Sequence, residues 1–167
     1  MARFAEAFWA FSLELYARPG IQAQLLRLQD EYRLNVNLIL LMLFLAERRT
    51  RLGDDVLLEA SQCAHRFEAT HLNALRKVRR HLKPEAAAHP HGELHAFRES
   101  VKEAELAGEK ALQAELAEIA ANALEDGREP RTIARDGMER YGRLRADANG
   151  AVPRQDIEAL LVLAFPG

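Results

Sequence analysis

The sequence is poor in cysteine and in aromatic residues, and it lacks a long uninterrupted apolar run. One cysteine, Cys63, among 167 residues excludes an internal disulfide framework and a cysteine-rich zinc site. The most apolar run, residues 34–46, is interrupted by Asn35 and Asn37 and falls short of the roughly 20 apolar residues that cross a bilayer. We therefore expect no membrane span. Because Glu6 interrupts the first residues, we also expect no secretory signal and a cytoplasmic location with a reduced thiol.

Charge of one sign is also lacking, since 23 basic and 25 acidic side chains leave a net charge of −2. This balance disfavours nucleic acid as a partner of the whole chain. The charge is nevertheless divided unevenly, with 13 Lys and Arg against 9 Asp and Glu in residues 1–83, and 10 against 16 in residues 84–167. Either the solvated faces of the helices differ, or the two parts attract each other or meet different partners.

The sequence contains no motif with a recognised catalytic spacing. A glycine-rich phosphate loop is absent, and Ser12, Ser61 and Cys63 stand without a base at a recognisable distance along the chain. We therefore assign no catalytic residue and no cofactor, and the sequence favours a protein without enzymatic activity.

Apolar residues recur at helical spacing along the chain, and the alternation typical of strands is missing. This pattern predicts an all-α, single-domain helical bundle of five to seven helices, two of them long and antiparallel. The expected parts are core helices in residues 4–51, the long helix pair in 54–126 and short C-terminal helices in 132–165.

The third core helix has boundary signals at both ends. Asn35 fits an N-cap, because its side chain can accept a hydrogen bond from a first-turn amide. We expect the helix to run to Arg51, with Arg48 and Arg49 in its last turn, where positive charge suits the helix dipole. Gly53 then fits a C-terminal cap.

The long pair is joined by the turn-forming residues 84–92. Its first helix should begin at Asp54 and Asp55, and its second should end at Glu125. At 1.5 Å per residue each spans about 45–50 Å, so we expect it to be kinked or to project as a hairpin. The apolar stripe of the first helix comprises Ala60, Ala64, Phe67, His71, Leu75, Val78 and Leu82. The middle of the second helix contains small residues that would allow a neighbouring helix to approach closely, namely Ala104, Ala107, Gly108 and Ala111.

Glu68 and His71 stand one helical turn apart, as a carboxylate and an imidazole do in di-iron bundles. A second such pair is missing, so Glu105 or Glu109 would have to supply further ligands. The alternative, which we favour, is a core-facing histidine with a hydrogen-bonded ring. We therefore predict no metal and keep Glu68 and His71 as weak candidates.

Four basic residues, Arg76, Arg79, Arg80 and Lys83, share one helix face, opposite an apolar one. Such a face can bind phosphate or carboxylate groups. Three interpretations stay open: a solvated face near a helix C-terminus, a site for an acidic protein surface that includes this chain's own second half, and a site for phosphate or RNA. Few aromatic residues lie beside the run, which disfavours stacking of single-stranded bases.

Tyr16, Gln29, Asn37 and His71 are polar residues within otherwise apolar helices. Buried polar groups need hydrogen-bond partners. These side chains therefore either bond to one another and fix helix packing, or line a pocket between helices. A pocket of this kind would suit an apolar or lipid-like ligand.

Residues 145–156 match part of a calcium-binding EF-hand loop, with Asp147 and Asn149 at two ligand positions. Arg145 stands where the first ligand is needed, and Asp156 replaces the bidentate glutamate. We therefore expect an Asn-Gly turn between two short helices instead of a calcium site.

The string F-W-x-F-S-L-x-L-Y at residues 8–16 resembles the opening of an uncharacterised proteobacterial family of small helical proteins. The strings L-Q-D at 28–30 and N-V-N-L at 35–38 are similar to it as well. Leu25 stands where the family often has cysteine, and Phe44 where it often has tryptophan. The family is of unknown function, so the resemblance implies a helical fold and a bacterial origin but no activity.

We interpret the chain as a non-enzymatic adaptor or regulatory protein of the cytoplasm. The missing catalytic spacing, the long helices and the opposed charges support this interpretation, although no partner is identified. We also expect self-association, because a long apolar stripe needs cover. The alternatives are a small-molecule binder or enzyme with a pocket between helices, and phosphate or RNA binding through the basic face of residues 76–83.

Overall fold

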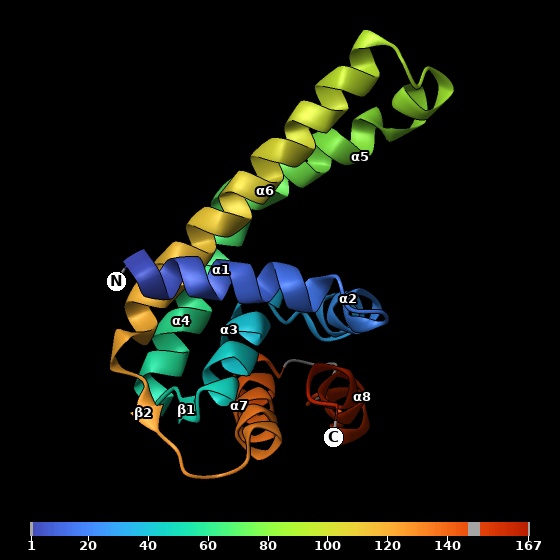
Figure 1. Cartoon of the computed structure of the whole chain (residues 1–167). Helices are drawn as coiled ribbons and strands as arrows, with labels where there is room; N and C mark the ends of the chain where they lie inside the picture. Colours follow the sequence, from blue (N-terminus) through green and yellow to red (C-terminus); the bar gives the residue numbers. More distant parts are fainter. Residues whose placement is uncertain (1, 147–150, 167) are drawn as a thin grey trace.

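Helix α3 (Val36–Glu47) lies at the centre of the fold, and all its residues from 37 to 46 are buried. A helix that is apolar all round needs cover on every side, so other helices surround it (Figure 1). Its beginning confirms the predicted cap. The Asn35 side chain accepts hydrogen bonds from the backbone N–H groups of Asn37 and Leu38, at 3.0 and 3.2 Å.

Helices from both ends of the chain cover α3. The structure describes residues 2–146 and 151–166. Three phenylalanine rings of the first helix pack on Phe44 of α3, with ring centroids 5.2, 5.3 and 5.4 Å apart. In Figure 1 the two C-terminal helices lie below α3. The helices from the two ends that pack on α3 are α1 (Ala2–Tyr16), α2 (Ile21–Tyr32) and α7 (Pro130–Arg145), whereas α8 (Arg154–Ala164) packs on α2 and α7.

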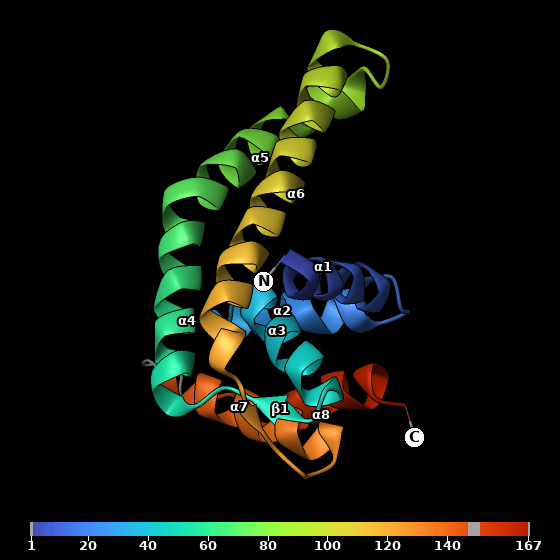
Figure 2. The same ribbon diagram turned by 60° about the vertical axis from the view of Figure 1, so that its left-hand side comes forward.

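The long antiparallel pair is confirmed as a hairpin that projects from the body (Figure 1). Its first helix is continuous through α4 (Asp54–Phe67), the π-helical turn η1 (Glu68–Leu72) and α5 (Asn73–Ala88). Helix α6 (Glu93–Ile119) returns along it. In Figure 2 the first helix is seen to curve, and the outer part of the hairpin stands clear of α1, α2, α7 and α8.

The π-helical turn changes which residues of α5 face α6. The N–H of Asn73 donates to the carbonyl of Glu68, five residues earlier, whereas an α-helix reaches four residues back. The extra residue turns the following helix by about 100°. Leu72 is therefore buried, while His71 and Val78, which we expected in the apolar stripe, are exposed.

The predicted close approach of a neighbouring helix occurs at one of the four small residues, and the neighbour is the first helix of the hairpin. A Cβ added to Gly108 would lie 2.7 Å from the Cδ2 atom of Leu72, so the leucine occupies the space that a side chain would need. Ala104, Ala107 and Ala111 are exposed instead.

The end of α3 differs from the prediction. The helix ends at Glu47 and does not continue to Arg51. Arg49 adopts a positive φ of 53°, and this left-handed conformation is incompatible with a continuing right-handed helix. Gly53, which we expected to cap α3, is instead the residue that precedes the first turn of α4.

A short antiparallel ladder, which the sequence analysis did not predict, joins the two long helices at their base. Strand β1 (Thr50–Arg51) pairs with strand β2 (Leu124–Glu125). Helix α6 consequently ends at Ile119 and is followed by the 3-10 turn η2 (Ala120–Asn122), so the predicted helix end at Glu125 is wrong. Strands of two residues are too short to show an alternating pattern.

The two short C-terminal helices are confirmed. Helix α7 packs on α3, and α8 packs on α2 and α7. Pro130 occupies the first turn of α7, where its missing N–H costs no hydrogen bond. Within residues 2–146 and 151–166, no helix has the length and apolarity needed to cross a membrane.

Deletion of Ala69, an exposed residue of η1, tests the origin of the π-helical turn. Removing one residue should convert the turn to α-helix without rotating α5, so that Leu72 and Arg76 keep their neighbours. We expect a melting temperature within about 3 °C of wild type, measured by circular dichroism.

Deletion of Lys77 is the matched control, because this exposed residue lies in regular α-helix beyond the turn. It should rotate the rest of α5 by about 100° against α6 and lower the melting temperature by more than about 8 °C. Equal losses from the two deletions would contradict the assignment of η1 as a one-residue insertion.

Candidate functional site

A partly buried ion-pair group lies where the hairpin leaves the body. Arg76 of α5 donates from Nη2 to Oε1 of Glu109 on α6 at 2.8 Å, and from Nη1 to Oε1 of Glu68 on η1. The three side chains are 17%, 25% and 20% exposed, respectively. Burial lowers the pKa of the Arg76 guanidinium, but the two carboxylates outweigh this effect and raise the pKa overall. One cation therefore stays charged and holds two anions together.

Asn37 connects this group to the core. Its Nδ2 donates to Oε2 of Glu109, and its Oδ1 accepts from Nε2 of Gln113 at 2.9 Å. The hydroxyl of Ser12 on α1 lies 3.1 Å from Oε1 of Gln113 and 2.9 Å from the carbonyl of Phe8. Ser12, Asn37 and Gln113 are all buried, so their polar groups need hydrogen-bond partners within the protein. They supply these partners to one another across α1, α3 and α6.

Asn35 extends the hydrogen bonds toward α7. Its Nδ2 donates to Oε2 of Glu68 at 3.2 Å, and its backbone N–H donates to the hydroxyl oxygen of Tyr141 at 2.9 Å. Burial raises the pKa of Tyr141, so the phenol stays protonated. We call the linked residues the root network, and they are Ser12, Asn35, Asn37, Glu68, Arg76, Glu109, Gln113 and Tyr141.

The structure divides the four predicted basic residues into two pairs. Arg76 and Arg79 face α6, where Nε of Arg79 lies 2.6 Å from Oε1 of Glu105. Arg80 and Lys83 are exposed. The acceptors on α6 belong to the acidic second half of the chain, so for the first pair the arrangement favours an intrachain partner over an external anion.

Of the four residues proposed for a polar core or pocket, Asn37 joins the root network. Tyr16 packs, partly buried, against the apolar core, and this burial raises the pKa of its hydroxyl. Gln29 bonds instead to the side chain that follows it in sequence, at 3.4 Å. His71 is exposed on η1, because the π-helical turn rotates it away from the core.

The weak metal candidates have different surroundings. Glu68 is held by Arg76, whereas the ring of His71 packs on Phe67 with centroids 4.7 Å apart. The part of the chain that the structure describes contains no group of three or more His, Cys, Asp or Glu residues that could hold a metal ion. Glu68 and Glu109, considered above as co-ligands, do come together, but around a guanidinium.

The sequence analysis gave no structural or binding role to three members of the root network, which are Ser12, Gln113 and Tyr141. A signal existed for one of them. Glu105, Glu109 and Gln113 are spaced four residues apart, so they form a polar row beside the apolar stripe of α6. Spacing gives no such signal for Tyr141, which meets Asn35 across 106 residues of chain.

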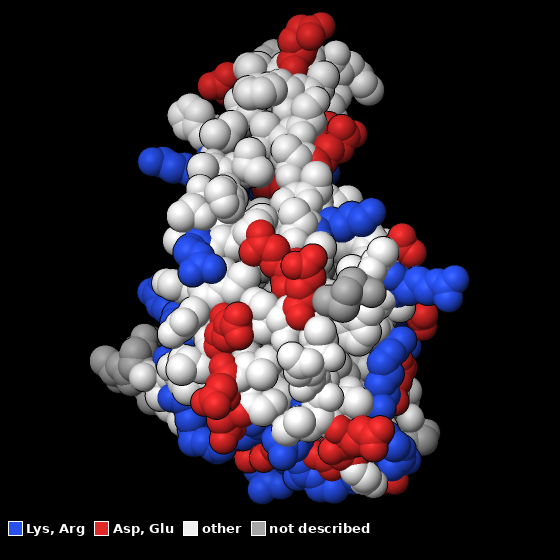
Figure 3. Space-filling view, turned by 90° about the vertical axis from the view of Figure 1, so that its left-hand side faces the viewer, with Lys and Arg blue, Asp and Glu red and all other residues white. Residues whose placement is uncertain are grey.

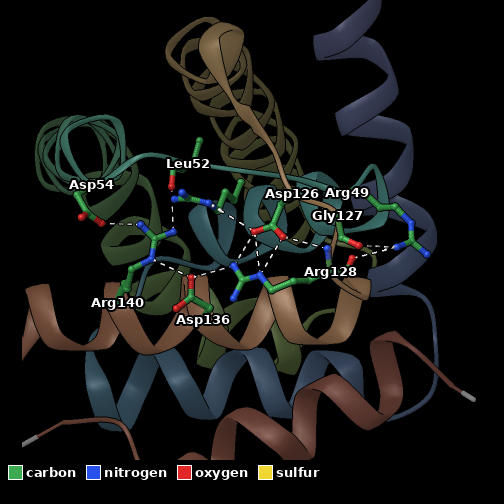
Figure 4. Close-up of polar contacts among 9 residues, drawn as sticks. Arg49, Leu52, Asp54, Asp126, Gly127, Arg128, Asp136 and Arg140 are labelled. Atoms are coloured by element: carbon green, nitrogen blue, oxygen red, sulfur yellow. Dashed lines mark hydrogen bonds and ion pairs between the residues drawn. The ribbon is translucent and has the colours of Figure 1, made fainter.

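A second polar cluster lies at the base of the molecule (Figure 4). Arg140 of α7 pairs with Asp54 at the start of α4 at 2.6 Å and donates to the carbonyl of Leu52 at 2.9 Å. Arg128 bonds to Asp126 at 2.5 Å and lowers the pKa of that carboxyl to about 2. Arg140 thereby ties α7 to the start of α4. Because one partner of each pair is open to solvent, with Asp54 86% and Arg128 45% exposed, each pair contributes little to stability.

A groove of about 430 Å³ lies between α4 and α6. The thiol of Cys63 faces Oε2 of Glu115 there, with 3.3 Å between sulfur and oxygen. Burial, and then this carboxylate, raise the pKa of Cys63 to about 11, so the thiol is neutral at pH 7 and is not an activated nucleophile. The lining residues are Glu59, Gln62, Cys63, Arg66, Glu115, Glu118 and Ile119.

The segment with EF-hand spacing supplies one buried carboxylate. Asp156 of α8 accepts a hydrogen bond from the Tyr32 hydroxyl at 2.5 Å and pairs with Arg27 at 3.2 Å, and it thereby ties α8 to α2. The hydrogen bond raises the pKa of Tyr32 to about 12. The other predicted loop positions, Asp147 and Asn149, lie outside the described residues.

One comparison with known proteins finds a match. A family model described as "Protein of unknown function (DUF2390)" matches residues 7–116, which run from α1 into α6. This match confirms the resemblance to a family of unknown function. No curated protein and no solved structure matches the chain.

Replacing Arg76 with methionine tests the root network. Glu68 and Glu109 would lose their shared cation while remaining partly buried, so the free energy of unfolding should fall by about 3 kcal/mol. Urea unfolding measures this quantity. Arg80→Met, which removes an exposed cation from the same helix, should change it by less than about 0.5 kcal/mol. Similar losses from the two variants would show that the network adds no specific stability.

The environment of Cys63 predicts slow alkylation. Because its pKa rises from 9.0 to about 11, the native thiol should react with iodoacetamide at pH 8 about 100-fold more slowly than in the urea-unfolded chain. The rate should increase as the pH approaches 11. Equal rates for the folded and the unfolded chain at pH 8 would contradict the neutral, buried thiol.

Proposed function

Since the chain belongs to this family of unknown function, we propose from its own geometry that it is a non-enzymatic interaction protein. Its α5–α6 hairpin is the arm that binds a protein partner in the bacterial cytoplasm. The observation that carries this proposal is that the hairpin projects from the body (Figure 1) and has large apolar side chains exposed to solvent.

The exposed apolar side chains of the hairpin suit an interface. Leu94 and Phe97, which follow the turn between α5 and α6, are 41% and 52% exposed, and Leu106 is 53% exposed. Buried aromatic and aliphatic anchors supply much of the energy of protein–protein interfaces. A partner that covers Phe97 would remove apolar surface from water, which is the main driving force for association.

The arm is held in one orientation relative to the body. The root network fixes its lower end, and Arg79 pairs with Glu105 further out. Leu72 fills the space beside Gly108 between the two helices. A pre-ordered arm loses less conformational entropy when it binds, so a modest contact area suffices for a stable complex.

The other candidate functions receive less support. A catalytic carboxylate must reach its substrate, whereas both carboxylates of the root network are held by Arg76 and by an asparagine amide. Binding of phosphate or RNA would depend on Arg80 and Lys83, since Arg76 and Arg79 are paired internally. Self-association remains part of the proposal, because a second copy is one protein that could cover the arm.

The test compares two substitutions at equally exposed apolar positions. Phe97 on the arm and Val162 on α8 are each 52% exposed. Phe97→Glu should reduce the amount of partner protein that the tagged chain retains from a lysate of its source cells by at least about tenfold. Val162→Glu should leave it unchanged, as measured by quantitative mass spectrometry.

Light scattering of the purified chain completes this experiment by detecting self-association. Equal retention by wild type and Phe97→Glu would overturn the arm as a binding element. A monomeric chain that retains no protein above an untagged control would overturn the interaction function itself.

A further inference from the structure

We propose that one continuous face of α6, from Phe97 down to the groove at Glu115, binds an amphipathic helix that carries lysine or arginine at one end. This inference rests on the proposed function and specifies the partner of the same arm. Three features carry it: an uncharged exposed stripe, an acidic groove at the end of that stripe, and their alignment along one helix.

The uncharged stripe consists of exposed small residues below one large anchor. Phe97, Ala104 and Ala111 are spaced seven residues apart and therefore lie on one face of α6. All three are exposed. Together they extend over about 21 Å of helix, which equals four turns. In Figure 3 the hairpin surface on this side is mainly uncharged.

The acidic groove lies directly below this stripe. Glu115 and Glu118 follow Ala111 by four and seven residues, so they continue the same face of α6. Both line the groove of about 430 Å³, together with Glu59 from α4. Three carboxylates face only one guanidinium there, that of Arg66. Figure 3 shows acidic side chains gathered below the uncharged part of the hairpin.

The shape and charge of this face define the chemistry of the occupant. Alanine side chains leave room for a second helix to pack closely, with its ridges against the α6 surface. An apolar helix face would cover Phe97 and the alanines, which is the helix-in-groove mode of recognition. At the lower end a cation is needed, because a neutral or acidic group would leave the glutamates unpaired or repelled. Phosphate groups of nucleic acid or of a lipid surface are repelled for the same reason.

A display library of amphipathic helices about 18 residues long is the probe. Selection against the full chain should enrich peptides with apolar residues at helical spacing and with Lys or Arg gathered at one end. Binding of these peptides should weaken as the salt concentration increases, because the contact at the groove is electrostatic.

Two pairs of variants locate the bound peptide. Glu118→Lys reverses a charge in the groove, and Glu103→Lys makes the same change at an exposed position of α6 that is not among the groove-lining residues. Ala104→Glu blocks the stripe, and Ala74→Glu makes the same change at an exposed position of α5. The first member of each pair should weaken peptide affinity by at least about tenfold, and the second should leave it within about twofold.

The outcomes separate this inference from the proposed function. A library without binders, binders without a basic end, or equal affinity for all four variants would overturn the inference. A dimer that Ala104→Glu dissociates would also overturn it, since a second copy would then occupy the stripe, while the interaction function would stand. If Phe97→Glu leaves partner retention unchanged, the proposed function fails whatever the peptides do.

Discussion

The hairpin keeps its orientation because one guanidinium, cut off from most of the solvent, has two carboxylates within reach. Arg76 is the only cation among the eight members of the root network, and each of its two anions comes from a different segment. Removing a charge from water costs free energy, and the attraction between the paired charges offsets this cost only when their geometry is held fixed. The amides of Asn35 and Asn37 supply this restraint from the central helix, so the position of the arm depends on the core.

The π-helical turn is what allows this pairing. With an uninterrupted α-helix, His71 would replace Leu72 on the face toward α6, and Arg76 would turn away from Glu109 by about 100°. Because of this turn, the contact between the two hairpin helices is partly apolar and partly ionic. Leu72 packs beside Gly108, and Arg76 and Arg79 pair with glutamates of α6. Val78 is left on the surface as a result.

The sequence allowed most of the helices to be predicted, because their apolar spacing is regular and their ends carry local signals such as Asn35. What escaped prediction depends on distant contacts. No local pattern shows that the helix adds one residue at Glu68, or that Thr50 pairs with Glu125. The candidate site was found in part: its two asparagines and Arg76 stand out by their surroundings in sequence, whereas Tyr141 joins them only through the fold.

The two-residue ladder at the base has an architectural consequence. Thr50 and Arg51 lie opposite Glu125 and Leu124, so the chain enters and leaves the long helical excursion at neighbouring points. In an antiparallel ladder such partners are about 4.5–5.5 Å apart. The segment from α4 to α6 is therefore attached to the rest of the protein at a single place, because its two ends lie side by side. Its outer turns can lengthen, shorten or change composition during evolution without moving the helices that it leaves behind, so the reach of the arm and the stability of the body can be selected separately.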